Sequence, residues 1–135
     1  GILHPRHSGS ASQFGLTMGI PSIGVAKSLI GGIPGILPEK SLRSEAAHTM
    51  PGVGDFVELT ENTTQKTLGV ALRTSKDTKP IYVSVGHKIS LEDAIKVVRM
   101  CCWSGVRQPD PIRAADQLCR GKTEISSIKK SLGIY

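Results

Sequence analysis

The chain has 135 residues, of which 17 are basic and 11 are acidic, so its formal net charge is +6 at neutral pH. This length supports one domain with a single core, and the charge permits a polyanionic partner such as nucleic acid. The sequence contains no run of 18 apolar residues, which argues against a membrane-spanning helix. No secretory signal opens the chain, and its three cysteines follow no disulfide or zinc spacing, so we expect an intracellular protein of the cytoplasm or nucleus.

The N-terminal part of the chain predicts a helix, a strand and a loop. Ala11, Phe14 and Met18 have helical spacing and predict a short helix. Its glycines weaken a helix intrinsically, so we expect another element to pack closely against it. Segment 21–30 follows a proline and predicts a short buried strand, whereas the glycine- and proline-rich segment 31–40 predicts a loop.

The middle of the chain predicts strands and the remainder predicts helices. Segments 56–59, 66–74 and 80–86 read as strands, and the polar turn between the last two predicts a hairpin. From Leu91 to Cys102 the apolar period changes to that of a helix, which Ser90 would cap through a variant of the capping box. Two further helices are expected around Ile112–Cys119 and Ile125–Leu132. This order predicts an α/β domain.

Polar side chains near the ends of the predicted elements are candidates for a functional site. His4 and Arg6 precede the first helix, Lys27 ends a predicted strand, and His87 and Lys88 end another. Strand ends are where open α/β sheets place their ligands. The alternative for each is a solvated surface residue, which is the commoner fate of a basic side chain.

Other residues point to a site without completing one. Gly24 lies inside a predicted strand, which indicates the close approach of a backbone or ligand. Asp116 stands alone in a late helix and could instead form a surface ion pair with Arg113 or Arg120. The expected site has no paired carboxylates for Mg²⁺. No Walker loop or GxGxxG motif supports a nucleotide cofactor.

Three motifs occur in a fixed order: "HPRHSGSASQFG…GIPSIGVAKSLI", "TLGVALRT…KPIYVSVGHKISLEDAIKVV" and "DPIRAAD". Together they resemble the C-terminal part of the endonuclease V family, from Gly1 to about Arg120, within a single domain over residues 1–135. The resemblance implies a ribonuclease H-like fold, with a mixed sheet flanked by helices, incomplete at the N-terminus. In the family an aspartate-glycine-x-glycine turn precedes the "HPR" segment. Gly1 resembles the last glycine of that turn, and the metal-binding aspartate would lie just upstream.

The resemblance implies a Mg²⁺-dependent endonuclease that acts on inosine-containing RNA or DNA, single- or double-stranded, with RNA favoured. The family cuts at the second phosphodiester on the 3′ side of inosine. By the same likeness His87 lies near the metal and the attacking water, and Lys27 meets a phosphate or the developing charge. Asp116 would orient Lys27 or His87.

Nucleic-acid contacts are implied by the resemblance for the loop beside the absent aspartate and for a backbone pocket that takes the flipped hypoxanthine. The residues concerned are His4, Arg6, Gly1, Gly9 and Gly24, with Lys88 as a phosphate contact. Gln13 departs from the family, which usually has a histidine there. The alternative function is a catalytically inactive nucleic-acid-binding remnant that lacks the metal-binding carboxylates.

Overall fold

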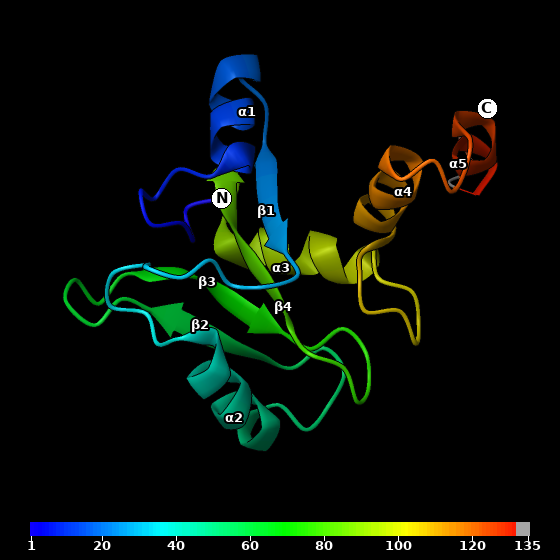
Figure 1. The fold of residues 1–135 in the computed structure, drawn as a ribbon. Coiled ribbons are helices and arrows are strands. Elements are labelled where there is room, and N and C mark those ends of the chain that lie inside the picture. The colour runs from blue at the N-terminus through cyan, green and yellow to red at the C-terminus, as the bar shows by residue number, and fades with distance from the viewer. Residues whose placement is uncertain (132–135) are drawn as a thin grey trace.

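A computed structural model describes residues 1–131, without side-chain detail at positions 43, 45–47 and 131. A sheet forms its centre, and helices lie on both faces and beyond one end (Figure 1). The elements in chain order are α1 (Ser10–Met18), β1 (Ser22–Ala26), α2 (Glu39–Thr49), β2 (Phe56–Thr60), β3 (Thr67–Leu72), β4 (Ile81–His87), α3 (Leu91–Met100), α4 (Asp110–Cys119) and α5 (Ile125–Ser131).

The sheet has four strands in the order β1-β4-β3-β2, and each neighbouring pair is antiparallel. The predicted hairpin is confirmed, because Leu72 of β3 pairs with Ile81 of β4 across the polar turn. The α/β fold is also confirmed. The resemblance implied a mixed sheet, whereas every strand pair within residues 1–131 is antiparallel.

The core has two parts, one on each face of the sheet. On one face α3 packs its Ala94, Ile95 and Val98 against the inner strands. On the other face Leu42 of α2 joins a cluster around Tyr82 of β4. Burying one such aliphatic or aromatic side chain contributes about 1.5–3 kcal/mol. Coverage on both faces explains why β3 is apolar almost throughout.

Helix α3 forms where the sequence predicted it. The Ser90 hydroxyl accepts a hydrogen bond from the Asp93 amide at 3.0 Å and donates one to the Asp93 carboxylate at 2.8 Å. Glu92 and Lys96 form an ion pair of 2.7 Å on the exposed face. The cap satisfies an amide that has no partner inside the helix.

The structure differs from the sequence-based prediction at two elements. β1 ends at Ala26, earlier than the predicted segment 21–30, because the chain then turns away to line a pocket. Helix α2 was not predicted at all. Its sequence has Leu42 as its one large apolar residue, so it carries little of the apolar periodicity that marks a helix.

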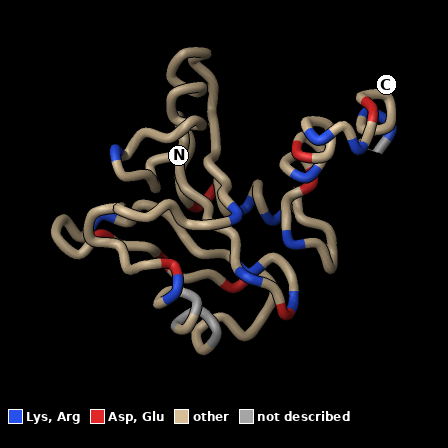
Figure 2. Tube along the Cα trace, viewed as in Figure 1, with Lys and Arg blue, Asp and Glu red and all other residues tan. Residues whose placement is uncertain are grey.

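Close packing against α1 is confirmed at Gly15. A Cβ there would lie 2.2 Å from the Ser22 Oγ and 2.6 Å from the His87 Cβ, so only glycine allows this approach to β1 and β4. Helices α4 and α5 extend away from the sheet, on the right in Figure 1, and carry Lys and Arg residues along their length (Figure 2). No helix among the described residues combines the length and apolarity needed to cross a membrane.

Candidate nucleic-acid site at the end of strand β1

Three glycines from separate segments meet beside β1. The Gly9 amide donates a hydrogen bond to the Gly1 carbonyl at 2.9 Å. A Cβ on Gly24 would lie 2.5 Å from the Gly1 nitrogen, and one on Gly9 would lie 3.0 Å from the Gly1 oxygen. The N-terminal loop therefore rests directly on the backbone of β1, a contact that larger residues would prevent.

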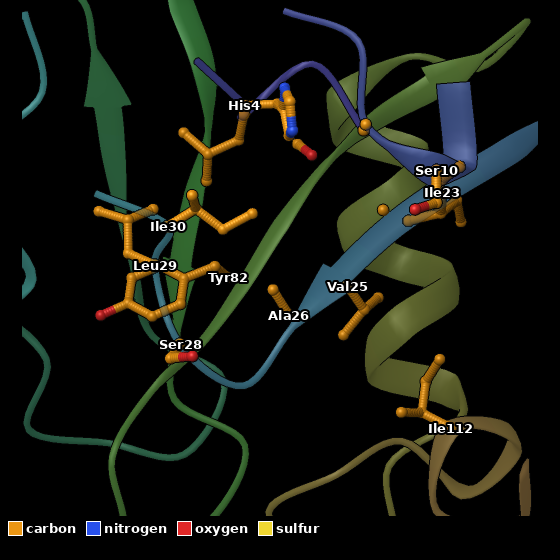
Figure 3. Close-up of a pocket in the computed structure, with 16 residues that line it drawn as sticks. His4, Ser10, Ile23, Val25, Ala26, Ser28, Leu29, Ile30, Tyr82 and Ile112 are labelled. Carbon is orange, nitrogen blue, oxygen red and sulfur yellow. The ribbon is translucent and has the colours of Figure 1, made fainter. Parts of the chain in front are cut away.

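This contact forms one wall of a pocket of about 370 Å³. The pocket opens around β1, with Tyr82 and Leu29 on one side of the strand and Val25 and Ile112 on the other (Figure 3). Its lining is backbone, apolar side chains and a few polar groups, which suits a flat and mostly uncharged ligand. The lining residues are Gly1, Leu3, His4, Gly9, Ser10, Ala11, Ile23, Gly24, Val25, Ala26, Ser28, Leu29, Ile30, Tyr82, Ser84 and Ile112.

An ion pair lies at the edge of this pocket. The Lys27 ammonium is 3.5 Å from the Asp116 carboxylate, which also accepts a hydrogen bond from the Arg120 guanidinium at 3.2 Å. Both chain neighbours of Lys27 line the pocket, as does Ile112, one helical turn before Asp116. The structure therefore brings together two of the predicted site residues, Lys27 and Asp116, at the edge of the pocket that the three glycines line.

The Asp116 carboxylate is ionised at neutral pH. Partial burial raises its pKa, but the hydrogen bond and charge of Arg120 and the charge of Lys27 outweigh burial and hold the pKa below its usual value. Both partners of the Lys27–Asp116 pair are substantially exposed, with side-chain accessibilities of 44% and 34%. Exposed pairs are worth at most about 1 kcal/mol, so a phosphate can compete for the lysine.

Arg107 holds this arrangement and was not predicted from the sequence. Its guanidinium donates hydrogen bonds to the backbone carbonyls of Lys27, Lys79 and Pro80, the last two at 2.8 and 2.9 Å. Its own carbonyl accepts a hydrogen bond from the Thr74 hydroxyl. These bonds tie the loop before α4 to the end of β1 and the start of β4. Arg107 lies in the loop between Gly105 and Pro109, which carries no periodic signal that would have identified it.

His87 and Lys88 lie at the other end of the same strands. His87 pairs with Ser22 at the start of β1, whereas Tyr82 pairs with Ala26 at its end. Five strand residues span about 17 Å, so the structure does not bring His87 to Lys27. The reason is that β1 and β4 are antiparallel, which sends their C-terminal ends in opposite directions. The Lys88 ammonium donates a hydrogen bond to the carbonyl of Gly19, which ends α1.

The remaining predicted residues lie in or near the N-terminal loop. His4 lines the pocket and its Nδ1 accepts a hydrogen bond from the Arg6 amide at 3.2 Å. Arg6 is exposed and lies outside the pocket lining. The Gln13 amide donates a hydrogen bond to the Ser8 carbonyl at 3.4 Å, which supports the same loop.

Comparison with known proteins decides the family. The family model for endonuclease V matches residues 1–117. This chain belongs to the endonuclease V family. Human endonuclease V is 37% identical over 135 residues, which cover 99% of this chain and 44% of that protein. Endonuclease V of Rippkaea orientalis is 39% identical over 130 residues, 96% of this chain and 50% of the relative.

Solved structures of endonuclease V share the fold. The catalytic domain of human endonuclease V matches with a TM-score of 0.79 at 36% identity, covering 100% of this chain and 51% of that structure. Endonuclease V of Ciona intestinalis, crystallised with a DNA that contains an inosine followed by a ribo-adenosine, matches with a TM-score of 0.80 at 33% identity, covering 90% and 51%. The ribonuclease H-like assignment agrees with these matches. The chain spans about half the length of the endonuclease V proteins that it matches.

The candidate site has too few ligand side chains among the described residues to bind a divalent metal ion. Within residues 1–131, no group of three or more His, Cys, Asp or Glu side chains is close enough to bind one ion. Asp116 is the carboxylate of the candidate site, and the positively charged side chains of Lys27 and Arg120 already contact it. Magnesium is held by several oxygen ligands, so these described residues of the endonuclease V chain do not by themselves form a magnesium site.

Proposed function

We propose that this chain is part of an endonuclease that cuts inosine-containing nucleic acid. The observation that carries the proposal is the backbone-lined pocket beside the Lys27–Asp116 pair. A base taken out of its stack is read in a snug pocket through hydrogen bonds to its edge. The glycines at Gly1, Gly9 and Gly24 allow backbone groups to reach such a base. The Ciona intestinalis relative, bound to inosine-containing DNA, supports the same class of substrate.

The charged residues have separate roles in this proposal. Lys27 contacts a phosphate near the flipped nucleotide or stabilises the negative charge that develops at the phosphate that is cut. Asp116 holds the Lys27 ammonium in place when no phosphate is bound. His4 contacts the base or sugar from the loop, and Arg6 adds an exposed positive charge. A catalytic role for His87 requires the reacting phosphate to lie beside α1, about 17 Å from the end of β1 where Lys27 lies.

The finer features of the proposal come from the resemblance. They are dependence on Mg²⁺, a preference for RNA, cleavage at the second phosphodiester 3′ to inosine, and residence in the cytoplasm or nucleus. The described residues do not form a metal site, so we assign no chemical step to the ion. By the resemblance, the aspartate expected just upstream of Gly1 would be one of the groups that hold it.

A second candidate function follows from the lone carboxylate. With Asp116 as its one acid, the candidate site of the described residues can bind phosphates but lacks the paired acids of a metal nuclease. In this alternative the chain is a nucleic-acid-binding protein that does not cut. Lys27, Arg6 and Lys88 would then supply phosphate contacts, and binding would weaken steeply with salt.

The test compares this chain with a longer version that extends upstream from Gly1. Both are incubated with Mg²⁺ and a single-inosine RNA or its DNA counterpart, and each is also made with His87→Ala. Cleavage by the longer version alone supports the nuclease, and a loss on His87→Ala would assign that residue to the reaction. Salt-sensitive binding by both versions without cleavage would favour the binding protein and overturn the nuclease.

A further inference from the structure

A second pocket, of about 290 Å³, lies between the loop before β2 and the loop after α3. It shares no lining residue with the first pocket. The proposed cleavage of inosine-containing strands gives it no role. Its lining residues are Val53, Gly54, Arg73, Thr74, Arg99, Cys102, Trp103 and Ser104.

An exposed aromatic ring forms one wall of this second pocket. Trp103 is the single tryptophan of the chain, and 63% of it is exposed. Val53, on the opposite loop, is equally exposed at 63%. Apolar surface gathered around a pocket marks a binding site more often than scattered exposed residues do. The Trp103 side chain is therefore accessible to a partner in this pocket.

Two guanidinium groups give the second pocket a positive charge. Arg73 and Arg99 both line it, and none of its lining residues in the described chain is acidic. The Arg73 Nε is buried and has no hydrogen-bond partner among the described residues. Arg99 is fixed in place, because it donates to the Gly54 carbonyl and lies 5.5 Å from the centre of the Phe56 ring. Each guanidinium has five donors, so both retain donors for an anion.

The adjacent hollow provides a contrast within the same surface. It also uses Arg99, and Lys96 lines it too, but Glu58 and Glu92 balance these two positive charges. These carboxylates oppose the approach of an anion, whereas the described residues that line the second pocket, from here on the Trp103 pocket, include no carboxylate. A phosphate is therefore expected at the Trp103 pocket and not at its neighbour.

We propose that the Trp103 pocket binds one nucleotide of a single strand, with the base stacked on Trp103 and its phosphate at Arg73 and Arg99. The proposal rests on the proposed function, which makes the partner a nucleic acid. Base stacking on an aromatic ring beside arginines is how single strands are held without sequence preference. One ring provides one stacking position, which agrees with the low aromatic content of the chain, 4%. Arg107 ties the same loop to the Lys27 carbonyl, so this position is connected to the first site.

The experiment uses the intrinsic fluorescence of the single tryptophan. Hexauridylate, which contains no inosine, is titrated into the chain, and we expect saturable quenching. Affinities of the variants are measured by the anisotropy of labelled hexauridylate. Loss of one stacked base weakens single-strand binding by about tenfold in Trp103→Ala, and Trp103→Phe should restore most of it. Arg73→Gln should weaken binding and flatten the dependence of log affinity on log salt by about 0.7.

A charge-matched control and a folding control make the result decisive. Lys129→Gln removes one positive charge from α5, which does not line the Trp103 pocket. Because Lys129 makes no contact with the strand in this proposal, the variant should bind hexauridylate with an affinity within about twofold of the unchanged chain. Each variant is included only with an unchanged circular dichroism spectrum. Binding of hexauridylate that leaves the tryptophan unquenched and survives Trp103→Ala would overturn the proposal, as would no binding at all. Cleavage at inosine is measured separately, so failure of the nuclease and failure of this pocket remain distinguishable.

Discussion

Replacing Gly24 by alanine tests whether the first pocket depends on contact between two backbones. A Cβ at this position would lie 2.5 Å from the Gly1 nitrogen and 2.7 Å from the Gly1 Cα. Favourable contacts between such atoms occur at about 3.5–4.0 Å, so either the loop or β1 must move by about 1 Å. Inserting one methyl into a packed contact of this kind costs about 1–3 kcal/mol.

Gly31→Ala is the matched control. A Cβ at Gly31 would have no heavy atom of the described residues within 4 Å, and Gly31 has no left-handed backbone to strain. Where alanine fits, this exchange stabilises a protein by about 0.4–1 kcal/mol because it restricts the unfolded chain. A urea m-value of about 2 kcal/mol/M converts a loss of about 2 kcal/mol in Gly24→Ala into a midpoint lower by about 1 M.

The assay is urea unfolding followed by circular dichroism, with hydrogen exchange of the Gly9 amide as a second measurement. The Gly9 amide donates to the Gly1 carbonyl, so its exchange quickens if the loop undocks while the sheet stays folded. Gly24→Ala should lower the midpoint, accelerate Gly9 exchange, or do both. An unchanged midpoint together with unchanged Gly9 protection would refute the reasoning.

Three further predictions concern Arg107, Asp116 and the cysteines. Arg107 reaches its three carbonyls from two nitrogens, Nε and Nη2, whereas a lysine carries all its donors on one nitrogen, so Arg107→Lys should lower the free energy of unfolding by about 1–3 kcal/mol. A change below about 0.5 kcal/mol in urea would contradict this, since that is the range of neutral surface substitutions. The lowered pKa of Asp116 means that its ion pairs stabilise the fold above about pH 4 and lose this effect as pH falls through the lowered pKa. Carboxyl NMR should show that Arg120→Ala raises this pKa, and an unchanged titration would be inconsistent with the pairing. Burial and the neighbouring Cys101 raise the pKa of Cys102, whereas Cys119 is exposed. Iodoacetamide should therefore label Cys119 before Cys102, as followed by mass spectrometry. Equal labelling rates would contradict this difference in reactivity.

The sequence could predict elements whose signal is local. The β3–β4 hairpin follows from two apolar segments around a polar turn, and α3 follows from its helical period and the Ser90 cap. These features depend on residues within a few positions of one another. In both elements the local hydrogen bonds and the burial of apolar side chains favour the same structure, so the prediction for each was confirmed.

The sequence could not predict features that depend on distant segments. Helix α2 has Leu42 as its single large apolar residue and packs only once Tyr82 and the strands are in place. The separation of Lys27 from His87 depends on the direction of β1 relative to β4, which neither strand encodes by itself. Arg107 acts through carbonyls up to 80 positions away along the chain. The arrangement of the candidate site is therefore set by topology, which local sequence patterns do not encode.

The most direct test of the account is the single-turnover cleavage rate of a single-inosine strand by the longer version of the protein, with Lys27→Ala. Lys129→Ala is the charge-matched control from α5. Removing one donor that stabilises developing charge lowers the rate by about 100- to 1000-fold, so the account predicts a loss of this size for Lys27→Ala and none for Lys129→Ala. Equal rates for the two variants would contradict the assignment of the site to the end of β1.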